Sequence, residues 1–359
     1  MLPLTPPLEP MLAKSADAVP RGGGMVFEPK WDGYRLIVFR DGAEIVLQSR
    51  SGKPLNRYFP EAEVMLLDAL PARCVVDGEL VVAHDGRLSF DLLSERVHPA
   101  ASRIELLSRQ NPTSFIAFDL LAIDDTVLLD APFTARREAL EKVLSTGPNV
   151  HLTPVTDVPE VAEQWFRLFE GAGLDGVICK PADSAYTPGK RTMLKVKHAR
   201  TADCVVAGYR WHKTGDVVGS LLLGLHDDAG VLHHVGVCGA FPAAQRASLV
   251  DELAPLRLPA GDEDHPWLGD PPTPHQRRPG AENRWRTGDL PWVPLRPDRV
   301  VEVAYEHTEG SHPARFRLNP RFVRWRPDRE PASCRYEQLD EPTRYDLDSV
   351  LRGEVRARS

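Results

Sequence analysis

VFEPKWDGYRLIVF, residues 26–39, is the stretch of sequence from which the fold and the chemistry are best approached. Its apolar residues indicate β-strand, yet Lys30 stands at its centre, directly before a Trp-Asp-Gly turn. A lysine in this place can be a solvated charge beside a hairpin. Its surroundings are richer in functional groups than a turn requires, because they include Glu28, Pro29, Asp32 and Arg35. Features elsewhere in the chain must show whether Lys30 is a solvated residue of a hairpin or a reactive group.

Length and composition predict a globular protein of two domains. The chain has 359 residues, of which 42% are hydrophobic, enough to bury a sizeable core. No apolar run approaches the roughly 20 residues that span a bilayer. The N-terminal residues MLPLTPPLEPMLAK lack the basic segment and apolar core of a secretory signal.

The cysteines and histidines give no sign of a metal or disulfide framework. The five cysteines are scattered and form no Cys-x-x-Cys pair, which argues against a zinc ribbon and favours a reducing cytoplasm. The histidines show no ligand spacing, and we expect the pair His233-His234 to lie at the surface.

Charge is distributed unevenly along the chain. The formal net charge of −7 gives no whole-molecule reason to expect a nucleic-acid partner. Residues 180–200 and 315–329 are nevertheless dense in lysine and arginine interleaved with apolar and aromatic residues. These segments are either solvated faces or local phosphate-binding patches, because salt confines each field to about 10 Å.

The first 200 residues alternate strand and helix patterns. We expect strands at 37–47 (with a hairpin turn at Asp41-Gly42), 74–82, 115–122 and 176–179, and helices at 60–70, 135–144 and 159–170. The pattern predicts a mixed domain with largely antiparallel strands.

The pattern changes near Thr201, where short alternating strands begin. We expect strands at 203–211, 217–227, 231–241 and 299–308, and a helix at 242–253. About five short strands favour a small barrel of the oligonucleotide-binding (OB) type. The Pro-rich stretch 258–299 is read as a long loop or insertion. The domains are therefore expected at residues 1–200 and 201–359, the second including the insertion and a C-terminal tail.

The segment around Lys30 resembles motif I, Lys-x-Asp-Gly, of the covalent nucleotidyltransferases, which are the DNA ligases, RNA ligases and mRNA-capping enzymes. Four residues are a weak signal alone. Six further segments resemble the family's later motifs in order: SRSG at 49–52, VVDGELVV at 75–82, FDLL at 118–121, LDGVICK at 174–180, MLKVK at 193–197 and FVRWRPDR at 322–329. Seven ordered motifs make the resemblance specific.

Two flanking segments narrow the resemblance. PMLAK at 10–14 and YTPGKRTMLKVK at 186–197 resemble the bacterial ATP-dependent DNA ligases of the ligase C and ligase D type. The resemblance implies an α+β fold: a nucleotidyltransferase (adenylation) domain of mostly antiparallel sheets with helices, followed by an OB-fold β-barrel domain. Compared with larger relatives, we expect no further DNA-binding, polymerase or nuclease module.

The resemblance also implies the reaction. Lys30 would attack the α-phosphate of ATP and form a lysyl-AMP intermediate; AMP would pass to a DNA 5′-phosphate, and the 3′-hydroxyl would displace it. A lysine amine attacks only when neutral. Phosphoryl transfer is catalysed mainly by positioning and charge neutralisation. The expected cofactors are ATP and a divalent metal, Mg²⁺ or Mn²⁺.

Residue roles carry over by motif position. The resemblance implies that the following residues form the site: Lys30 as nucleophile; Lys195 and Lys197 at the α-phosphate; Arg35 and Glu79 at the ribose; Phe118 stacked on adenine; Glu28, Pro29, Lys180 and Arg191 around the nucleotide; Arg50 at the DNA 5′-phosphate; Asp175, and secondarily Glu79, at the metal; and Arg326 and Asp328 of the last motif. Phe118 has an alternative role as a core residue, and Asp77 and Asp32 are read as structural.

Two positions depart from the family pattern. Asp175 stands where the fourth motif commonly has glutamate, so the metal distance would change by one methylene. The last motif ends in Arg329 where lysine is frequent, which keeps the charge and changes the geometry. This last motif is expected to orient the pyrophosphate leaving group.

Three other functions remain open at this point. A capping guanylyltransferase shares motif I and the barrel, and labelling by GTP in place of ATP would reveal it. An RNA ligase usually lacks such a barrel. A non-catalytic nucleic-acid-binding module has no need of Lys30, Glu79, Lys195 and Lys197 together.

The expected partner is nicked or broken duplex DNA. End-processing polymerases, nucleases or end-binding proteins would act in trans. We expect a monomer that works in the cytoplasm on the nucleoid, away from membranes.

Overall fold

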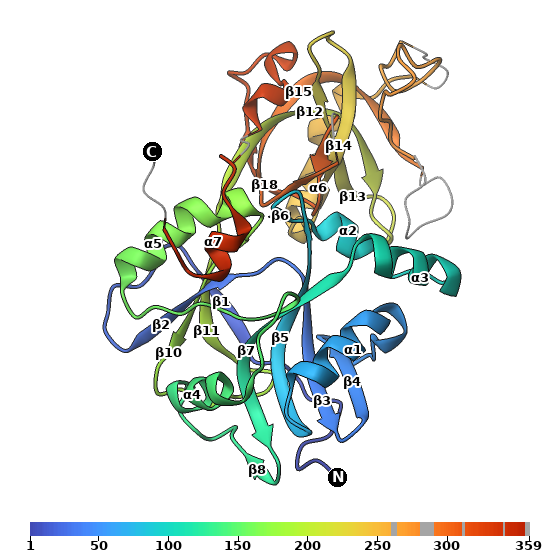
Figure 1. Cartoon of the computed structure of the whole chain (residues 1–359). Helices are drawn as coiled ribbons and strands as arrows, with labels where there is room; N and C mark the ends of the chain where they lie inside the picture. The colour runs from blue at the N-terminus through green and yellow to red at the C-terminus, as the bar shows by residue number, and fades with distance from the viewer. Residues whose placement is uncertain (260–263, 281–290, 311–312, 340–341, 356–359) are drawn as a thin grey trace. The chain divides into compact units, whose positions relative to one another are not determined.

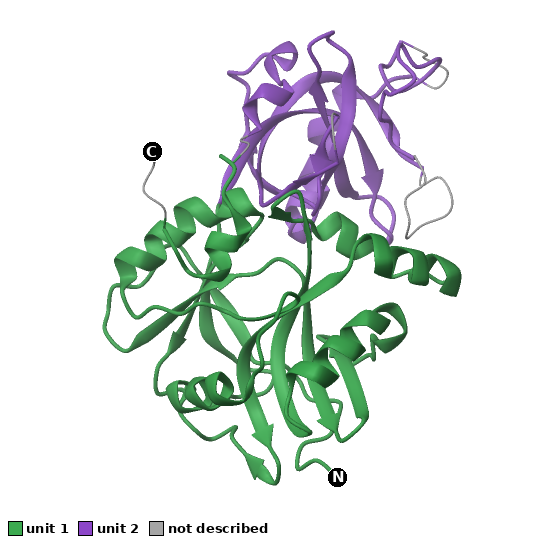
Figure 2. Cartoon of the chain, in the orientation of Figure 1, with its two compact units in different colours: residues 1–198, 342–359 green, residues 199–341 purple. Residues whose placement is uncertain are grey.

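The computed structural model describes residues 1–259, 264–280, 291–310, 313–339 and 342–355. The chain divides into two compact units (Figure 2): unit 1 comprises Met1–His198 and Pro342–Ser359, and unit 2 comprises Ala199–Glu341. The first boundary lies within two residues of the expected one. The C-terminal segment differs from the expectation, because it returns to unit 1 and does not continue unit 2.

The larger sheet of unit 1 has seven strands. Its path runs β4-β3-β5-β7-β8, with β6 beside β5 and β9 beside β7. The bounds are β3 Tyr34–Asp41, β4 Glu44–Ser49, β5 Arg73–His84, β6 Arg87–Leu88, β7 Thr113–Ile123, β8 Thr126–Val127 and β9 Val150–Leu152. The expected hairpin is present, and Gly42 takes the positive φ of 66° that its turn requires.

The smaller sheet of unit 1 has four strands in the order β1-β11-β10-β2 (Figure 1). The bounds are β1 Leu12–Ala16, β2 Met25–Lys30, β10 Gly176–Pro181 and β11 Arg191–Val196. β2 pairs with β10, whereas β3 pairs with β4 and β5. The hairpin reading of residues 26–39 is therefore wrong: Lys30 ends a strand of one sheet, and the next strand belongs to the other.

The helices of unit 1 include the three that were expected. α1 spans Pro60–Ala69, α4 Phe133–Val143 and α5 Pro159–Leu168, with prolines in the first turn of α1 and α5. α2 (Phe90–Glu95) and α3 (Ala101–Gln110) were not anticipated. The Ser89 hydroxyl accepts a hydrogen bond from the Leu92 amide and so caps α2.

The C-terminal segment, residues 342–355, completes a core of unit 1. Leu347 and Val350 of α7 (Leu347–Leu351) belong to the buried cluster that also holds Phe27 and Trp31, on either side of the Glu28-Pro29-Lys30 sequence. The Trp165 indole donates a 3.3 Å hydrogen bond to the Gly353 carbonyl. The segment thus packs into the same core as residues of β2, the strand that ends at Lys30.

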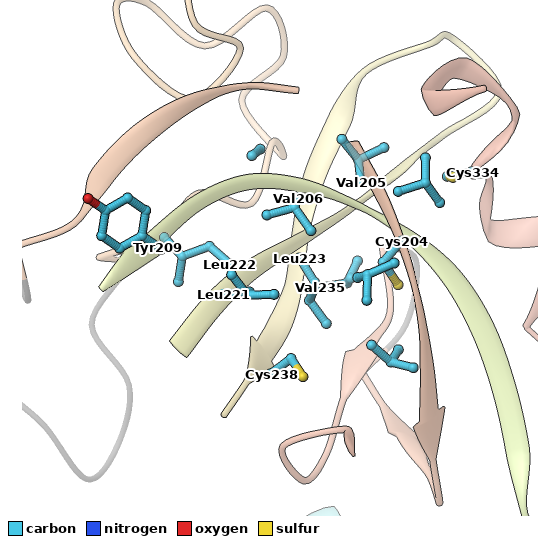
Figure 3. Packing of buried hydrophobic residues seen from close by; sticks show 14 of the residues in the cluster. Cys204, Val205, Val206, Tyr209, Leu221, Leu222, Leu223, Val235, Cys238 and Cys334 are labelled. Atoms are coloured by element: carbon cyan, nitrogen blue, oxygen red, sulfur yellow. The ribbon is translucent and has the colours of Figure 1, made fainter. Parts of the chain in front are cut away.

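Unit 2 is built on a five-stranded antiparallel sheet in the order β14-β13-β12-β15-β18. The bounds are β12 Arg200–Trp211, β13 Val218–His226, β14 Leu232–Cys238, β15 Val293–Tyr305 and β18 Arg321–Trp325, with helix α6 Ala243–Leu253 after the third strand. Buried apolar side chains from β12, β13 and β14 belong to one core cluster, and consecutive residues such as Leu221, Leu222 and Leu223 are all part of it (Figure 3). His233, expected at the surface, is instead buried and bound to Asp227 at 3.0 Å. The curled sheet confirms the expected OB fold.

The Pro-rich stretch is a packed loop in its described part. Residues 264–280 contain no helix or strand, as expected, but His265 and Trp267 are buried. The Trp267 indole donates to the Leu232 carbonyl at 3.0 Å. β15 begins at Val293, so the expected insertion ends earlier than predicted; residues 260–263 and 281–290 lie outside the described residues. No described helix is long and apolar enough to cross a membrane.

Candidate active site

A cavity of about 840 Å³ opens in unit 1 between its two sheets. Eleven of the residues predicted from the motifs line it: Glu28, Pro29, Lys30, Arg35, Arg50, Glu79, Phe118, Lys180, Arg191, Lys195 and Lys197. Asp175 lies behind Lys30, and Arg326 and Asp328 belong to unit 2. The eleven lining residues come from six strands (β2, β3, β5, β7, β10 and β11), the loop after β4 and the residues just after β11.

Strand alternation explains why these side chains face the cavity. On β11 and just beyond it, Arg191, Met193, Lys195 and Lys197 are spaced two residues apart and all line the cavity. Successive side chains of a strand point to opposite faces, so a spacing of two keeps one face. Ile178 and Lys180 of β10 follow the same rule. Met193 and Ile178 were missed as site residues, although this alternation within the motifs signals them.

Lys30 is held by Asp175 through both backbone and side chain. The Asp175 amide donates to the Lys30 carbonyl at 2.9 Å, and the Lys30 amine donates to the Asp175 carboxylate. Lys197 Nζ lies 2.9 Å from the same carboxylate oxygen. The Asp175 side chain is only 3% exposed, against 21% for Lys30. The predicted metal ligand is therefore, in this structure, the counter-ion of two cavity lysines.

Arg35 is fixed by a residue that sequence reasoning treated as structural. Its Nε and Nη2 donate to the two carboxylate oxygens of Asp77 at 2.5 and 2.6 Å. Tyr186 also donates to this fully buried carboxylate, at 2.6 Å. Burial opposes the charged guanidinium, but Asp77 outweighs it and raises the pKa of Arg35. Asp77 thus orients Arg35, a role that depends on cross-strand pairing between β3 and β5.

Phe118 forms an aromatic wall of the cavity beneath two cations. Its ring is 7% exposed and lies 4.5 Å from the Arg35 guanidinium carbon and 5.0 Å from Lys180 Nζ. Lys180 Nζ also lies 2.9 Å from a carboxylate oxygen of Glu28, and both side chains are buried. Burial raises the pKa of Glu28 although Lys180 opposes the rise. This arrangement provides a flat apolar surface next to fixed charge.

Glu79 is the cavity carboxylate whose proton affinity is most clearly altered. It pairs in register with Arg35 across β3 and β5 and is half-buried. Burial raises its pKa to about 7, while Arg35 and Lys30 work in the opposite direction. Near neutral pH this side chain can donate as well as accept a hydrogen bond, as a ligand hydroxyl requires.

The loop after β4 brings exposed cationic side chains to the cavity. Arg50 and Lys53 both line it, and Lys53 was not predicted. The loop is shaped by its own hydrogen bonds, from the Lys53 amide to the Ser49 hydroxyl at 3.0 Å and from the Gly52 amide to the Ser49 carbonyl at 2.9 Å. Gly52 takes φ of 82°, which favours glycine.

The donor set around the cavity fits a metal held partly by substrate. The described residues contain no group of three or more His, Cys, Asp or Glu side chains able to enclose an ion. Mg²⁺ is commonly held by one or two carboxylates together with phosphate oxygens. Glu79 at the wall and Asp175 behind Lys30 are carboxylates of this kind.

The last motif is organised within unit 2. Arg326 follows β18, and its guanidinium lies 2.9 Å from Asp203 and 2.8 Å from Asp328. The hydrogen bond from Arg326 holds the pKa of Asp328 at about 2. Arg329 Nε, the departure from the family pattern, lies 3.4 Å from Asp203. Two arginines thus share one carboxylate.

A cavity that holds a lysine amine, an aromatic wall, a carboxylate and further lysines fits the site of a covalent nucleotidyltransferase. A model described as "ATP dependent DNA ligase domain" matches residues 10–197, and one described as "ATP dependent DNA ligase C terminal region" matches residues 214–329. The chain belongs to the ATP-dependent DNA ligase family.

Individual relatives agree with this assignment. The chain is 55% identical over 350 residues to DNA ligase C2 of Mycolicibacterium smegmatis, covering 95% of this chain and 96% of the relative. It is 30% identical over 330 residues to the multifunctional non-homologous end joining DNA repair protein LigD of Mycobacterium tuberculosis, covering 90% of this chain and 39% of that protein. A solved structure of a Lig E DNA ligase shares the fold, with a TM-score of 0.55 at 17% identity over 89% of this chain and 99% of that one.

Proposed function

We propose that this chain joins the 3′-hydroxyl and 5′-phosphate ends of DNA through a lysyl-AMP intermediate on Lys30. The observation that carries the proposal is the Lys30 amine at the wall of a cavity with Lys180, Lys195 and Lys197. Such a concentration of positive charge suits a triphosphate, because phosphoryl transfer depends on neutralising and positioning phosphate oxygens.

In the first step the Lys30 nitrogen forms a bond to the α-phosphorus of ATP. The bond from that phosphorus to the oxygen bridging the β-phosphate breaks, and pyrophosphate leaves with the electron pair. The amine must lose its proton, and the Asp175 carboxylate that accepts its hydrogen bond is the base within reach. Lys197, paired with the same carboxylate, keeps its charge next to the reacting phosphate.

In the later steps AMP moves from Lys30 to the DNA. An oxygen of the DNA 5′-phosphate bonds to the α-phosphorus, and the phosphorus–nitrogen bond breaks with its electron pair going to nitrogen. That nitrogen takes back the proton held by Asp175 and so regenerates the Lys30 amine. The 3′-hydroxyl then attacks the adenylylated 5′-phosphorus, loses its proton, and releases AMP. Arg50, exposed on the loop after β4, is assigned to the 5′-phosphate.

We assign the nucleotide contacts to residues that line the cavity and stand at the matching motif positions. Phe118 stacks on the adenine, since its ring forms a flat apolar wall, and Arg35 and Glu79 bind the ribose hydroxyls. Glu28 and Pro29 form the wall beside Lys30, and Arg191 and Lys195 bind phosphate oxygens. Arg326 and Asp328 orient the leaving pyrophosphate. A divalent ion, Mg²⁺ or Mn²⁺, held by Asp175 or Glu79 together with ATP, would add Lewis-acid charge at the phosphates.

The setting we propose is DNA repair or end joining. The relatives named DNA ligase C2 and LigD support this setting, the latter by its description as an end-joining protein. End-processing enzymes would then act as separate partners on the same break. The five cysteines are buried free thiols, which suits an enzyme of the reducing cytoplasm. We propose that the enzyme works there as a monomer.

Ligation across a panel of substrates tests the proposal. The wild-type chain with ATP and Mg²⁺ or Mn²⁺ is given nicked DNA, a short gap, a 3′-ribonucleotide end, an RNA/DNA hybrid and a double-strand break. Sealing of at least one DNA substrate is expected, together with dependence on ATP. Covalent labelling by GTP and not ATP, with no DNA sealed, would contradict it and favour a guanylyltransferase.

A further inference from the structure

Tyr186 joins the two segments that flank the family motifs, residues 10–14 and 186–197. It lies in the loop between β10 and β11, and its hydroxyl accepts a 3.0 Å hydrogen bond from the Met11 amide, 175 positions away in the chain. Met11 lines the active-site cavity and directly precedes β1, which runs parallel to β11. The Tyr186 hydroxyl therefore holds one edge of the cavity.

The same hydroxyl reaches the carboxylate that fixes Arg35. It donates to Oδ2 of Asp77 at 2.6 Å, and this oxygen also accepts from Arg35 Nη2 at 2.6 Å. Oδ1 of Asp77 accepts from Arg35 Nε at 2.5 Å. Asp77 is fully buried and Tyr186 is 2% exposed, so bulk water cannot replace these bonds. Hydrogen bonds thus run from the Met11 amide through Tyr186 and Asp77 to Arg35 on the cavity wall.

The chemistry of its members fixes the direction of each bond. A backbone amide and a guanidinium only donate, an ionised carboxylate only accepts, and a phenol can do both. Burial, and then Asp77, raise the pKa of Tyr186, so the phenol keeps its proton at neutral pH and donates it to Asp77. Rotation of the carboxylate would leave a buried polar group without its partner, which is costly. Asp77 therefore has one orientation, and so does the guanidinium that it binds at two points.

We propose that Tyr186 is a positioning residue that sets the preference of the enzyme for a ribonucleotide, acting through Asp77 on Arg35. The inference rests on the proposed function, in which Arg35 binds a ribose hydroxyl. A site built to hydrogen-bond a substrate hydroxyl rejects the analogue that lacks it. Without the phenol hydroxyl, Asp77 loses one of its donors and can turn together with Arg35. The contact to ATP then weakens, whereas a deoxynucleotide that lacks the contact has nothing to lose.

The test measures single-turnover formation of the lysyl adenylate with ATP, 2′-deoxy-ATP and 3′-deoxy-ATP. Tyr186→Phe keeps the buried ring and removes only the hydroxyl. We expect the half-saturating concentration of ATP to rise about tenfold, the size of one hydrogen bond to a charged group, while the rate at saturation is kept. The values for the deoxynucleotide that lacks the Arg35 contact should not change. The preference for ATP over that analogue therefore falls by the same factor.

Tyr336→Phe is the matched control. It removes a hydroxyl of unit 2 that donates to the Ala314 carbonyl at 3.1 Å, and it should keep the preference of the wild type. Each preference compares two nucleotides on one variant, so a smaller folded fraction cancels out of it. Asp77→Asn tests the route. It should lower the preference at least as far as Tyr186→Phe, and the double variant should match Asp77→Asn alone.

Three results would overturn the inference: a wild-type preference in Tyr186→Phe, equal losses with all three nucleotides, or losses that add in the double variant. Equal losses would give the hydroxyl a structural role only. Failure of the proposed function looks different, because the wild type would then form no lysyl-AMP from ATP. A wild type that is labelled equally by all three nucleotides would refute the ribose role of Arg35, and this inference with it, and leave Lys30 as the nucleophile.

Discussion

Lys30 and Asp175 bind each other twice, once through the backbone and once through their side chains. The Asp175 amide donates to the Lys30 carbonyl at 2.9 Å, and the Lys30 amine donates to the Asp175 carboxylate. Lys30 ends β2, and Asp175 directly precedes β10, the strand paired with β2. One strand pair therefore fixes the backbones of the nucleophile and its counter-ion relative to each other.

Replacing Asp175 by asparagine should slow lysyl-AMP formation by about 100-fold, the lower end of general acid–base effects. Asparagine keeps the backbone bond but cannot take the proton of Lys30. Single-turnover labelling with ATP measures the rate, and Asp183→Asn, an exposed aspartate after β10, is the control. An unchanged rate would show that Asp175 is not the base. Recovery of the rate at high Mg²⁺ would favour the metal role instead.

Glu79→Gln should change how stability depends on pH. The pKa of Glu79 is raised by burial from 4.5 to about 7. Between these values the folded state binds more protons than the unfolded state, so this residue's contribution to stability falls as pH rises through the window. As pH rises from about 4.5 to 7, we expect the melting temperature of Glu79→Gln to rise relative to that of the wild type. Above pH 7 the difference between the two melting temperatures should stay constant. Parallel curves throughout would contradict the raised pKa.

Gly171→Ala should loosen the C-terminal segment from unit 1. A Cβ at Gly171 would lie 1.9 Å from the Thr343 carbonyl oxygen, and backbone has to move. Overpacking of this kind costs about 1–3 kcal/mol, which lowers the melting temperature by roughly 3–10 °C. Adenylylation should fall as well, since Leu347 and Val350 pack with Phe27 and Trp31 beside Lys30.

Gly147→Ala is the matched control, because no atom lies within 4 Å of a Cβ built there. It should leave melting temperature and labelling unchanged. Equal behaviour of the two alanine variants would mean that the C-terminal segment does not support the core of unit 1.

Arg326→Ala should impair lysyl-AMP formation and spare the sealing of DNA that is already adenylylated. Removing this guanidinium leaves Asp203 with the ion pair to Arg329, whose Nε lies 3.4 Å from its carboxylate. Arg324→Ala on the same segment removes an exposed arginine paired with Glu302 and serves as control. Equal loss in both assays would place Arg326 in a later step or in folding.

Local pattern predicted the elements that depend on neighbours in the sequence. The apolar run at β5, the helix begun by Pro159 and the turn at Gly42 are of this kind. Motif order also predicted eleven of the residues that line the cavity, and most of these lie on strands whose alternation fixes the face of each side chain. The short helix α2 was missed, since its single fully buried residue, Leu93, leaves almost no periodic signal.

Contacts between distant segments were beyond sequence reasoning. The pairing of Arg35 with Asp77 depends on the β3–β5 register, and the use of Asp175 as counter-ion depends on the pairing of β2 with β10. The return of residues 342–355 to unit 1 rests on Gly171 leaving room for the Thr343 backbone. A single sequence carries no local sign of these long-range fits.

Mapping the adenylylation site tests the central claim most directly. The wild-type chain is incubated with labelled ATP and Mg²⁺, digested, and searched for the modified peptide; Lys30→Ala is treated in parallel. The account predicts one AMP on the peptide containing Lys30 and no label on the variant. A Lys30→Ala chain labelled as strongly as the wild type would contradict it.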